Sequence, residues 1–106
     1  MTVTYRQAAR NDVIRQFRYY LVEQDSPKVA VTFREAVRKT VQTLRRQPAM
    51  APAYKSDDAR LKALRSWPVA GFEAIRIYFL LENDRMEVIR ILHSKRDVRS
   101  ILEREV

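Results

Sequence analysis

Few residues of this chain could carry acid–base or metal chemistry. The sequence has one histidine, His93, at the end of an aliphatic run, and it has no cysteine. Imidazole suits proton transfer near neutral pH, so His93 is the first candidate for a catalytic acid or base. No Ser-His-Asp or Cys-His spacing surrounds it, and a single histidine leaves only scattered carboxylates for a metal ion. We therefore expect no cofactor and no metal site, and a hydrogen-bonded His93 at a strand-to-helix junction is the alternative to a catalytic one.

Polar residues inside apolar runs are the next candidates. Arg90 lies in an otherwise aliphatic segment, where an unpaired guanidinium would be costly to bury. It should either form an internal ion pair, with Glu73 or Asp97, or lie exposed. In the exposed case Arg90 would join Arg76 and Tyr78 in a cationic sheet surface that meets a partner.

The overall charge favours an anionic partner. The chain has 21 Lys and Arg against 13 Asp and Glu, a formal net charge of +8, and most of the surplus lies in residues 1–48. Such a surplus attracts nucleic acid, acidic protein segments or membrane surfaces. Arg34 and Arg38 lie on the polar side of the second predicted helix. Their side chains form either a solvated helix face or a contact with an acidic protein segment or DNA.

Length and composition limit the class of protein. At 106 residues the chain predicts a single domain, residues 1–106, with a core that needs no covalent staple. Without cysteine, a reducing cytoplasm is the expected compartment. The N-terminus lacks the pattern of a signal peptide, and no apolar run approaches the ~20 residues of a membrane span, so we expect no membrane partner.

Two amphipathic helices should follow a short strand at Val3–Tyr5. Apolar residues recur at three- and four-residue spacing over residues 7–23 and again over residues 27–46. Ser26 is a suitable N-cap and Pro27 suits the first helical position. Because the connection between the helices is so short, they must form an antiparallel hairpin.

The segment from residue 61 to residue 94 predicts an antiparallel sheet. Its apolar runs are rich in β-branched and aromatic residues and are separated by turn residues. The predicted strands and connections are Leu61–Trp67, the turn Pro68–Gly71, Phe72–Leu81, the bend Glu82–Arg85 and Met86–His93. Alternation along the second strand gives two opposite faces. One faces a core with Ile75, Ile77, Phe79 and Leu81, and the other is more polar, with Ala74, Arg76, Tyr78 and Leu80.

The remaining segments complete the fold. Gln47–Arg60 has two prolines and no periodicity, which indicates a loop. Ser94, with Asp97 three residues later, matches a capping box, so a last helix should begin there. The order β-α-α-β-β-β-α is an α+β fold in which the helical hairpin covers one face of a small antiparallel sheet. The side chains expected in its core are Phe17, Phe33, Val37, Ile75, Ile77 and Phe79.

Four sequence blocks stand out along nearly the whole chain. They are Ala9-x-x-Asp12-Val13-x-x-Gln16-Phe17, Phe33 with Leu44-Arg45-Arg46-Gln47-Pro48, Leu64-Arg65, and Val88-Ile89-Arg90-Ile91-Leu92-His93-x-x-Arg96-Asp97. In these blocks the chain resembles the RelE/ParE superfamily of bacterial type II toxins, and ParE more than RelE, because the last block is similar to a recurring ParE ending. Such toxins often have Ser or Thr before the first helix. This chain has Arg6 and Gln7 there, so the helix cap should be lost or moved.

The resemblance implies a ParE-like plasmid-stabilisation toxin that binds bacterial DNA gyrase and arrests it without catalysis. It also implies a cognate, ParD-like antitoxin with an acidic C-terminal tail, which would hold the toxin inactive in a cytoplasmic hetero-oligomer. The alternative is a RelE-like endoribonuclease that cuts messenger RNA on the ribosome, with His93 and Arg90 as catalytic candidates. In that branch a tyrosine often follows the histidine, and an arginine lies early in the strand that holds Tyr78. Ser94 and Ile75 occupy those two positions here, so the nuclease centre is incomplete.

A third possibility is a plain nucleic-acid-binding module. The positive charge is sufficient for it, but a base-reading motif is missing. The residues that we expect to bind the target or the antitoxin are Arg34, Arg38, Arg65, Arg76, Tyr78, Arg90, His93, Lys95 and Arg96.

Overall fold

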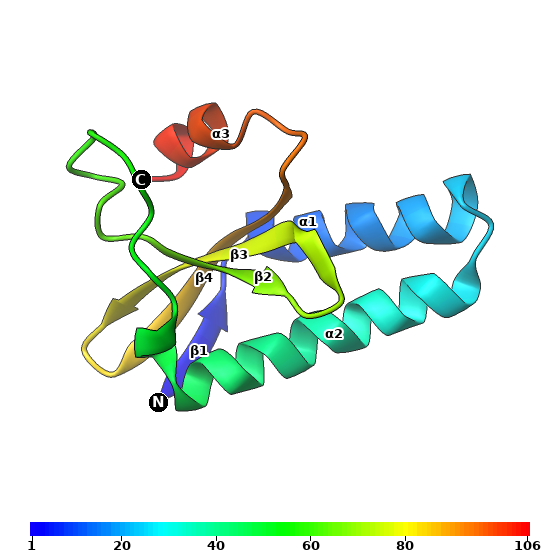
Figure 1. The fold of residues 1–106 in the computed structure, drawn as a ribbon, viewed down its shortest axis with the longest axis horizontal. Helices are drawn as coiled ribbons and strands as arrows, with labels where there is room; N and C mark the ends of the chain where they lie inside the picture. Colours follow the sequence, from blue (N-terminus) through cyan, green and yellow to red (C-terminus); the bar gives the residue numbers. More distant parts are fainter.

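Two long helices form a hairpin over one face of a four-stranded sheet, and a short C-terminal helix lies on the other face (Figure 1). The computed structural model describes all 106 residues. The elements in chain order are β1 (Thr2–Tyr5), α1 (Gln7–Arg18), the π-helical turn η1 (Tyr19–Glu23), α2 (Pro27–Arg46), the 3₁₀ turn η2 (Pro48–Met50), β2 (Arg65–Val69), β3 (Phe72–Glu82), β4 (Arg85–His93) and α3 (Val98–Glu105). The predicted order β-α-α-β-β-β-α is confirmed. No helix combines the length and the apolar character that crossing a membrane requires.

The helical hairpin forms where the apolar spacing predicts it. α1 begins after Arg6, which makes no side-chain cap, as the missing Ser or Thr predicted. The wider π turns of η1 carry the helix to Glu23, so the predicted extent is confirmed although its last part is not α-helical. α2 begins with the predicted cap, because Ser26 Oγ accepts a hydrogen bond from the Val29 N–H at 3.3 Å.

The sheet is mixed rather than purely antiparallel. Its strand order is β1-β4-β3-β2, and β3 is antiparallel to both of its neighbours. The predicted β3–β4 hairpin turns at Asn83 and Asp84, whose φ angles of 49° and 58° are those of a tight two-residue turn. β1 instead runs parallel to β4, so the expectation of an antiparallel sheet is wrong for this strand. Parallel pairing needs a long crossover, and the helical hairpin together with β2 and β3 provides it.

β2 occupies residues 65–69, whereas the sequence pattern predicted Leu61–Trp67 followed by a turn at Pro68–Gly71. The strand and a turn after it are confirmed, but the predicted bounds are wrong, because Leu61 and Leu64 are fully buried in the segment that precedes the strand. Their three-residue spacing fits a turn and not the two-residue alternation of a strand. Proline is tolerated in β2 because the strand lies at an edge of the sheet.

The main core lies between the helical hairpin and the sheet. Five of the six side chains predicted there are buried, namely Phe33, Val37, Ile75, Ile77 and Phe79. Phe17 is only partly buried, so its prediction is wrong. Figure 1 shows that the hairpin extends past the end of the sheet, where strands no longer cover it. Phe17 lies in the last turn of α1, and its ring packs beneath the Arg34 guanidinium, whose central carbon lies 5.2 Å from the ring centroid.

A second, smaller core covers the sheet face that was expected to be polar. Tyr78 on that face is only 4% exposed, and it packs in one cluster with Leu61, Leu64, Ile89, Leu92, Ile101 and Leu102. Alternation along β3 assigned the two faces of the strand correctly. It contains no information about the elements that cover the second face, which are α3 and the loop that precedes β2. A bulge between Tyr78 and Phe79 also shifts the alternation of β4, so that Val88 and Ile91, three residues apart, both face the main core, and Ile89 and Leu92 both face the second core.

α3 begins later than predicted. Ser94 is not its cap, because the Ser94 N–H donates to the Ala74 carbonyl at 2.7 Å and so extends the β3–β4 ladder. Asp97 is the N-cap, and its Oδ1 accepts from the Ser100 N–H at 3.4 Å. The turn between Ser94 and Asp97 redirects the chain from the strand onto the second core. The predicted loop Gln47–Arg60 is confirmed apart from the short turn η2.

Candidate functional site

Arg90 is bound into an ion-pair network and is not a free cation of the surface. Its Nε and Nη2 donate to the two carboxylate oxygens of Asp12 at 2.7 and 2.8 Å, and its Nη1 donates to Glu105 at 3.0 Å. The hydrogen bond with Asp12 raises the pKa of Arg90, although burial opposes it. The expected internal ion pair is therefore present, but the predicted partners Glu73 and Asp97 are wrong. Its partners Asp12 and Glu105 lie on α1 and α3, too far from Arg90 along the chain for local sequence spacing to identify them.

Of the other candidates on the sheet, Arg76 and Tyr78 on β3 lie on the face of the second core, whereas Arg65 on β2 is paired with Phe79 and so lies on the face of the main core. Arg65 donates to the Ala51 carbonyl at 2.8 Å, and Arg76 donates to Ser66 Oγ at 3.0 Å. Tyr78 packs edge-on against Tyr54, with 5.9 Å between the ring centroids. Burial raises the pKa of Tyr78, while the nearby charge of Arg76 opposes this. This part of the sheet is therefore held mainly by internal contacts, which leave Arg65 and Arg76 half-buried.

Arg34 and Arg38 lie beside a groove between α1 and α2. This interhelical groove has a volume of about 380 Å³ and is lined by Tyr5, Gln7, Arg10, Val13, Ile14, Arg34, Val37 and Arg38. Ile14, one of these lining residues, is 47% exposed, although it is a large apolar side chain. Arg38 pairs with Glu35 at 3.0 Å along the surface of α2. The groove therefore combines an exposed apolar side chain with three arginines.

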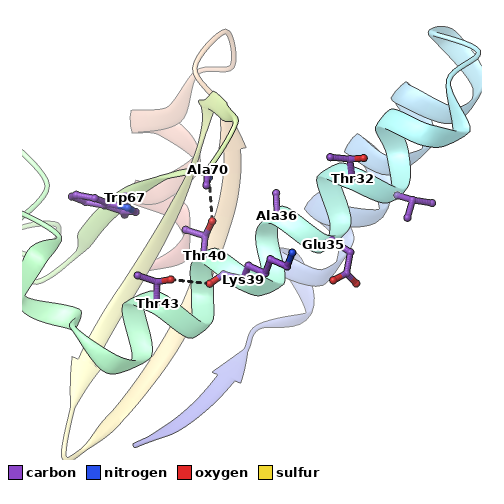
Figure 2. A pocket seen from close by; sticks show the side chains of 9 residues that line it. Thr32, Glu35, Ala36, Lys39, Thr40, Thr43, Trp67 and Ala70 are labelled. Carbon is purple, nitrogen blue, oxygen red and sulfur yellow. Dashed lines mark hydrogen bonds between the residues drawn. The ribbon is translucent and has the colours of Figure 1, made fainter.

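A second groove, the α2 groove, runs along the other side of α2 toward β2 (Figure 2). Its volume is about 490 Å³, and Val31, Thr32, Glu35, Ala36, Lys39, Thr40, Thr43, Trp67 and Ala70 line it. Figure 2 shows Trp67 and Ala70 on the sheet side of this space and the remaining labelled side chains along α2. Thr40 Oγ1 accepts from the Ala70 N–H at 3.1 Å, which ties α2 to the turn after β2. Val31 is 45% exposed at this groove.

All the large apolar side chains that remain exposed belong to the helical hairpin. They are Ile14, Tyr19, Leu21, Val22, Val29 and Val31. The sheet and α3 contribute none. Because the exposed apolar side chains are confined to the hairpin, the hairpin is the candidate interaction surface of the fold. Sequence periodicity missed this surface, because it assigns apolar residues on a helix to the core.

His93 lies at a third hollow, at the end of β4. This His93 pocket has a volume of about 510 Å³ and is lined by Arg15, Gln16, Tyr19, Tyr20, Gln24, His93, Lys95 and Arg96. His93 Nδ1 accepts a hydrogen bond from the Lys95 N–H at 3.1 Å, which is the bond expected of a histidine at this junction. Three of the nine predicted binding residues, His93, Lys95 and Arg96, thus meet in one place. Sequence spacing did not suggest Arg15 or Tyr19, which come from the helical hairpin.

No group of three or more His, Cys, Asp or Glu side chains is arranged to hold a metal ion. The nine predicted binding residues do not form one site. Arg34 and Arg38 belong to the interhelical groove, and His93, Lys95 and Arg96 belong to the His93 pocket. The remaining four, Arg65, Arg76, Tyr78 and Arg90, make internal contacts.

Comparison with known proteins gives one family. A family model described as the ParE toxin of the type II toxin–antitoxin system parDE matches residues 3–98. Among solved structures, a chain of the chromosomal ParDE system from P. aeruginosa aligns with a TM-score of 0.71 at 15% identity, covering 88% of this chain and 95% of that one. The YoeB/ParE toxin from Agrobacterium tumefaciens aligns with a TM-score of 0.61 at 13% identity, covering 88% and 98%. No curated protein matches the chain. The structural matches establish the α+β toxin fold.

Proposed function

Because the chain belongs to the ParE toxin family of type II toxin–antitoxin systems, we propose that it is a toxin that binds bacterial DNA gyrase and inhibits it. A cognate antitoxin neutralises it by covering the helical hairpin. Gyrase acts on DNA in the bacterial cytoplasm, so the protein works there. Family membership supports the toxin class, and the uncovered hairpin supports action through binding.

The observation that carries the proposal is the combination of exposed apolar side chains and positive charge on the hairpin. Ile14, Arg10, Arg34 and Arg38 all line the interhelical groove, and Ile14 is 47% exposed. An amphipathic helix with an acidic face would bury the apolar side chains of the groove and pair with its arginines. The net charge of +8 favours such an acidic antitoxin tail.

The alternative, messenger RNA cleavage, has less support from the side chains. Arg90 is saturated by Asp12 and Glu105, which removes it as a free phosphate ligand. Ile75, at the position where the nuclease branch has an arginine, is buried in the main core. Lys95 and two tyrosines line the pocket with His93, but none of their side chains is hydrogen-bonded to the imidazole, which accepts only the Lys95 backbone N–H. These contacts favour a toxin that acts by binding.

Two parallel assays test the proposal. Purified protein is added to gyrase in a DNA supercoiling assay and to ribosomes translating a defined messenger RNA. We expect supercoiling to be inhibited and the messenger RNA to stay intact, and antitoxin added beforehand should abolish the inhibition. Cleaved messenger RNA together with normal supercoiling would refute the proposal in favour of the nuclease.

A further inference from the structure

The proposed antitoxin contact uses the interhelical groove and the α2 groove, and the His93 pocket shares no lining residue with either of them. We propose that this pocket binds a nucleotide unit, with the phosphate against its cationic side chains and the base against the ring of Tyr19. The inference does not rest on gyrase inhibition, because it concerns the isolated protein and a ligand defined by its own chemistry.

Uncompensated positive charge is the first support. Arg15, Lys95 and Arg96 all line the pocket, and none of its lining residues is a carboxylate. Neither Arg15 nor Lys95 forms a salt bridge, and Arg96 reaches only Asp12, at 3.8 Å. That carboxylate already holds Arg90 at 2.7 Å. Burial lowers the pKa of Arg96, and the charge of Arg15 lowers it further, so a bound anion would relieve this crowding.

His93, which lines the same pocket, supplies a ring N–H donor. Its Nδ1 accepts the Lys95 N–H at 3.1 Å, so the proton of the neutral imidazole must be on Nε2. The ring therefore donates from Nε2 whether it is neutral or charged. With the two arginines and the lysine, it completes a set of donors suited to phosphate oxygens.

An exposed aromatic ring distinguishes a nucleotide from a simple anion. Tyr19 is 44% exposed, and its hydroxyl accepts a hydrogen bond from Gln24 Nε2 at 2.9 Å. Its ring packs edge-on against Tyr20, which in turn packs against Phe33 and Phe72. A ring fixed in this way can stack on a base, and stacking of this kind is how proteins hold nucleotides without reading their sequence. The π turns of η1, a type of turn frequent at functional sites, present both tyrosines to the pocket.

The size of the pocket fits the same ligand. Its volume of about 510 Å³ lies within the range of small-molecule sites, which is ~300–1,000 Å³. An acidic peptide would use the cations but has no need of the ring. The charge and the ring together therefore favour a nucleotide over a carboxylate partner.

The proposal is tested by titrating the full chain with four probes. NMR chemical shifts locate the binding site of each probe, and calorimetry measures its affinity. The probes are AMP, a ten-residue thymidine oligonucleotide, inorganic phosphate and a glutamate-rich peptide. Saturable binding of AMP identifies a single nucleotide as the ligand, and binding of the oligonucleotide alone identifies a nucleic-acid strand. Either result supports the proposal when the shifts map to the pocket. Equal affinity for AMP and phosphate, tighter binding of the peptide, or no binding at all would overturn it.

Matched variants locate the contacts. Arg15→Gln and Lys95→Gln each remove an exposed cation that has no salt-bridge partner, so folding should be unaffected. Each should weaken nucleotide binding about fivefold to tenfold, as expected for one charge-assisted hydrogen bond. Arg46→Gln and Lys62→Gln make the same charge changes at exposed positions outside the pocket and should leave the affinity unchanged. Equal losses in all four variants would show diffuse charge attraction and would overturn the proposal.

Tyr19→Leu separates the two halves of the ligand. The variant should weaken AMP binding while the weaker affinity for inorganic phosphate stays the same, because only the base contacts the ring. An unchanged affinity for AMP would remove Tyr19 from the site and refute the nucleotide assignment.

Discussion

Asp12 ties α1 to β4 through three hydrogen bonds that meet at one carboxylate. Arg90 donates two of them, and the Ile91 N–H donates the third at 2.9 Å. Asparagine would remove the charge and leave one oxygen for three donors at a position that is 5% exposed. We expect Asp12→Asn to lower the free energy of unfolding by ~2–4 kcal/mol, measured by urea denaturation. Asp57→Asn, at an exposed carboxylate without a salt bridge, is the control and should change it by less than ~0.5 kcal/mol. Equal stability of the two variants would contradict the role of Asp12.

Tyr78 makes stability sensitive to alkaline pH. Burial raises its pKa in the folded protein, whereas in the unfolded chain it titrates near its ordinary value of about 10. Above that pH the unfolded state binds fewer protons than the folded state. The contribution of Tyr78 to the free energy of unfolding is therefore fully present below pH ~10 and is lost as the pH rises through the folded pKa. Tyr78→Phe should therefore match the wild type in thermal unfolding at pH 7–9 and exceed it above pH ~10. Parallel loss of stability in both proteins would contradict this.

Arg90 illustrates what could be predicted at the residue scale. Its aliphatic surroundings required a carboxylate partner, and the structure has one. The identity of that partner depends on how α1 crosses the end of β4, 78 residues away along the chain. Local spacing therefore indicated the need for an ion pair but not its members. The same reason explains why His93, Lys95 and Arg96 were predicted without Arg15, which completes their pocket from α1.

At the scale of elements, the helices and the β3–β4 hairpin could be predicted because their signals are local. Periodicity, the Ser26 cap and the Asn83-Asp84 turn each depend on a few neighbouring residues. The direction of β1 and the covering of the second sheet face depend on contacts between distant segments. The start of α3 was predicted too early for a different reason. Ser94 and Asp97 are both good N-cap residues, but Ser94 continues the β3–β4 hydrogen-bond ladder, so the helix begins after Asp97.

The two grooves of the hairpin should bind the antitoxin through the exposed apolar side chains that line them. Ile14 and Val31 are 47% and 45% exposed, and each lines one groove. Ile14→Asp and Val31→Asp should each weaken binding of the cognate antitoxin about tenfold or more, because burying such a side chain contributes ~1.5–3 kcal/mol. Gln42→Asp on α2 makes the same charge change outside both grooves and serves as the control in a calorimetric titration. Full affinity in both groove variants would place the antitoxin elsewhere.

At the scale of the whole molecule, charge should govern the rate of antitoxin binding more than its strength. The protein carries +8 in 106 residues, so an acidic partner is steered toward it. Raising the salt from ~0.05 to ~0.5 M shortens the screening length about threefold. Surface plasmon resonance should then show slower association and a smaller change in dissociation. A salt effect mainly on the off-rate would point instead to desolvated ion pairs, with Arg34 and Arg38 as the first candidates.

Inhibition of gyrase by binding predicts a stoichiometric dose response. A toxin that occupies its target must be added in proportion to that target, whereas an enzyme acts at catalytic amounts. The decisive measurement is the toxin concentration that halves DNA supercoiling, determined at several gyrase concentrations well above the dissociation constant. We predict that this concentration rises in proportion to gyrase and that added antitoxin restores supercoiling. A half-inhibitory concentration far below that of gyrase and independent of it, or no inhibition at all, would contradict the account.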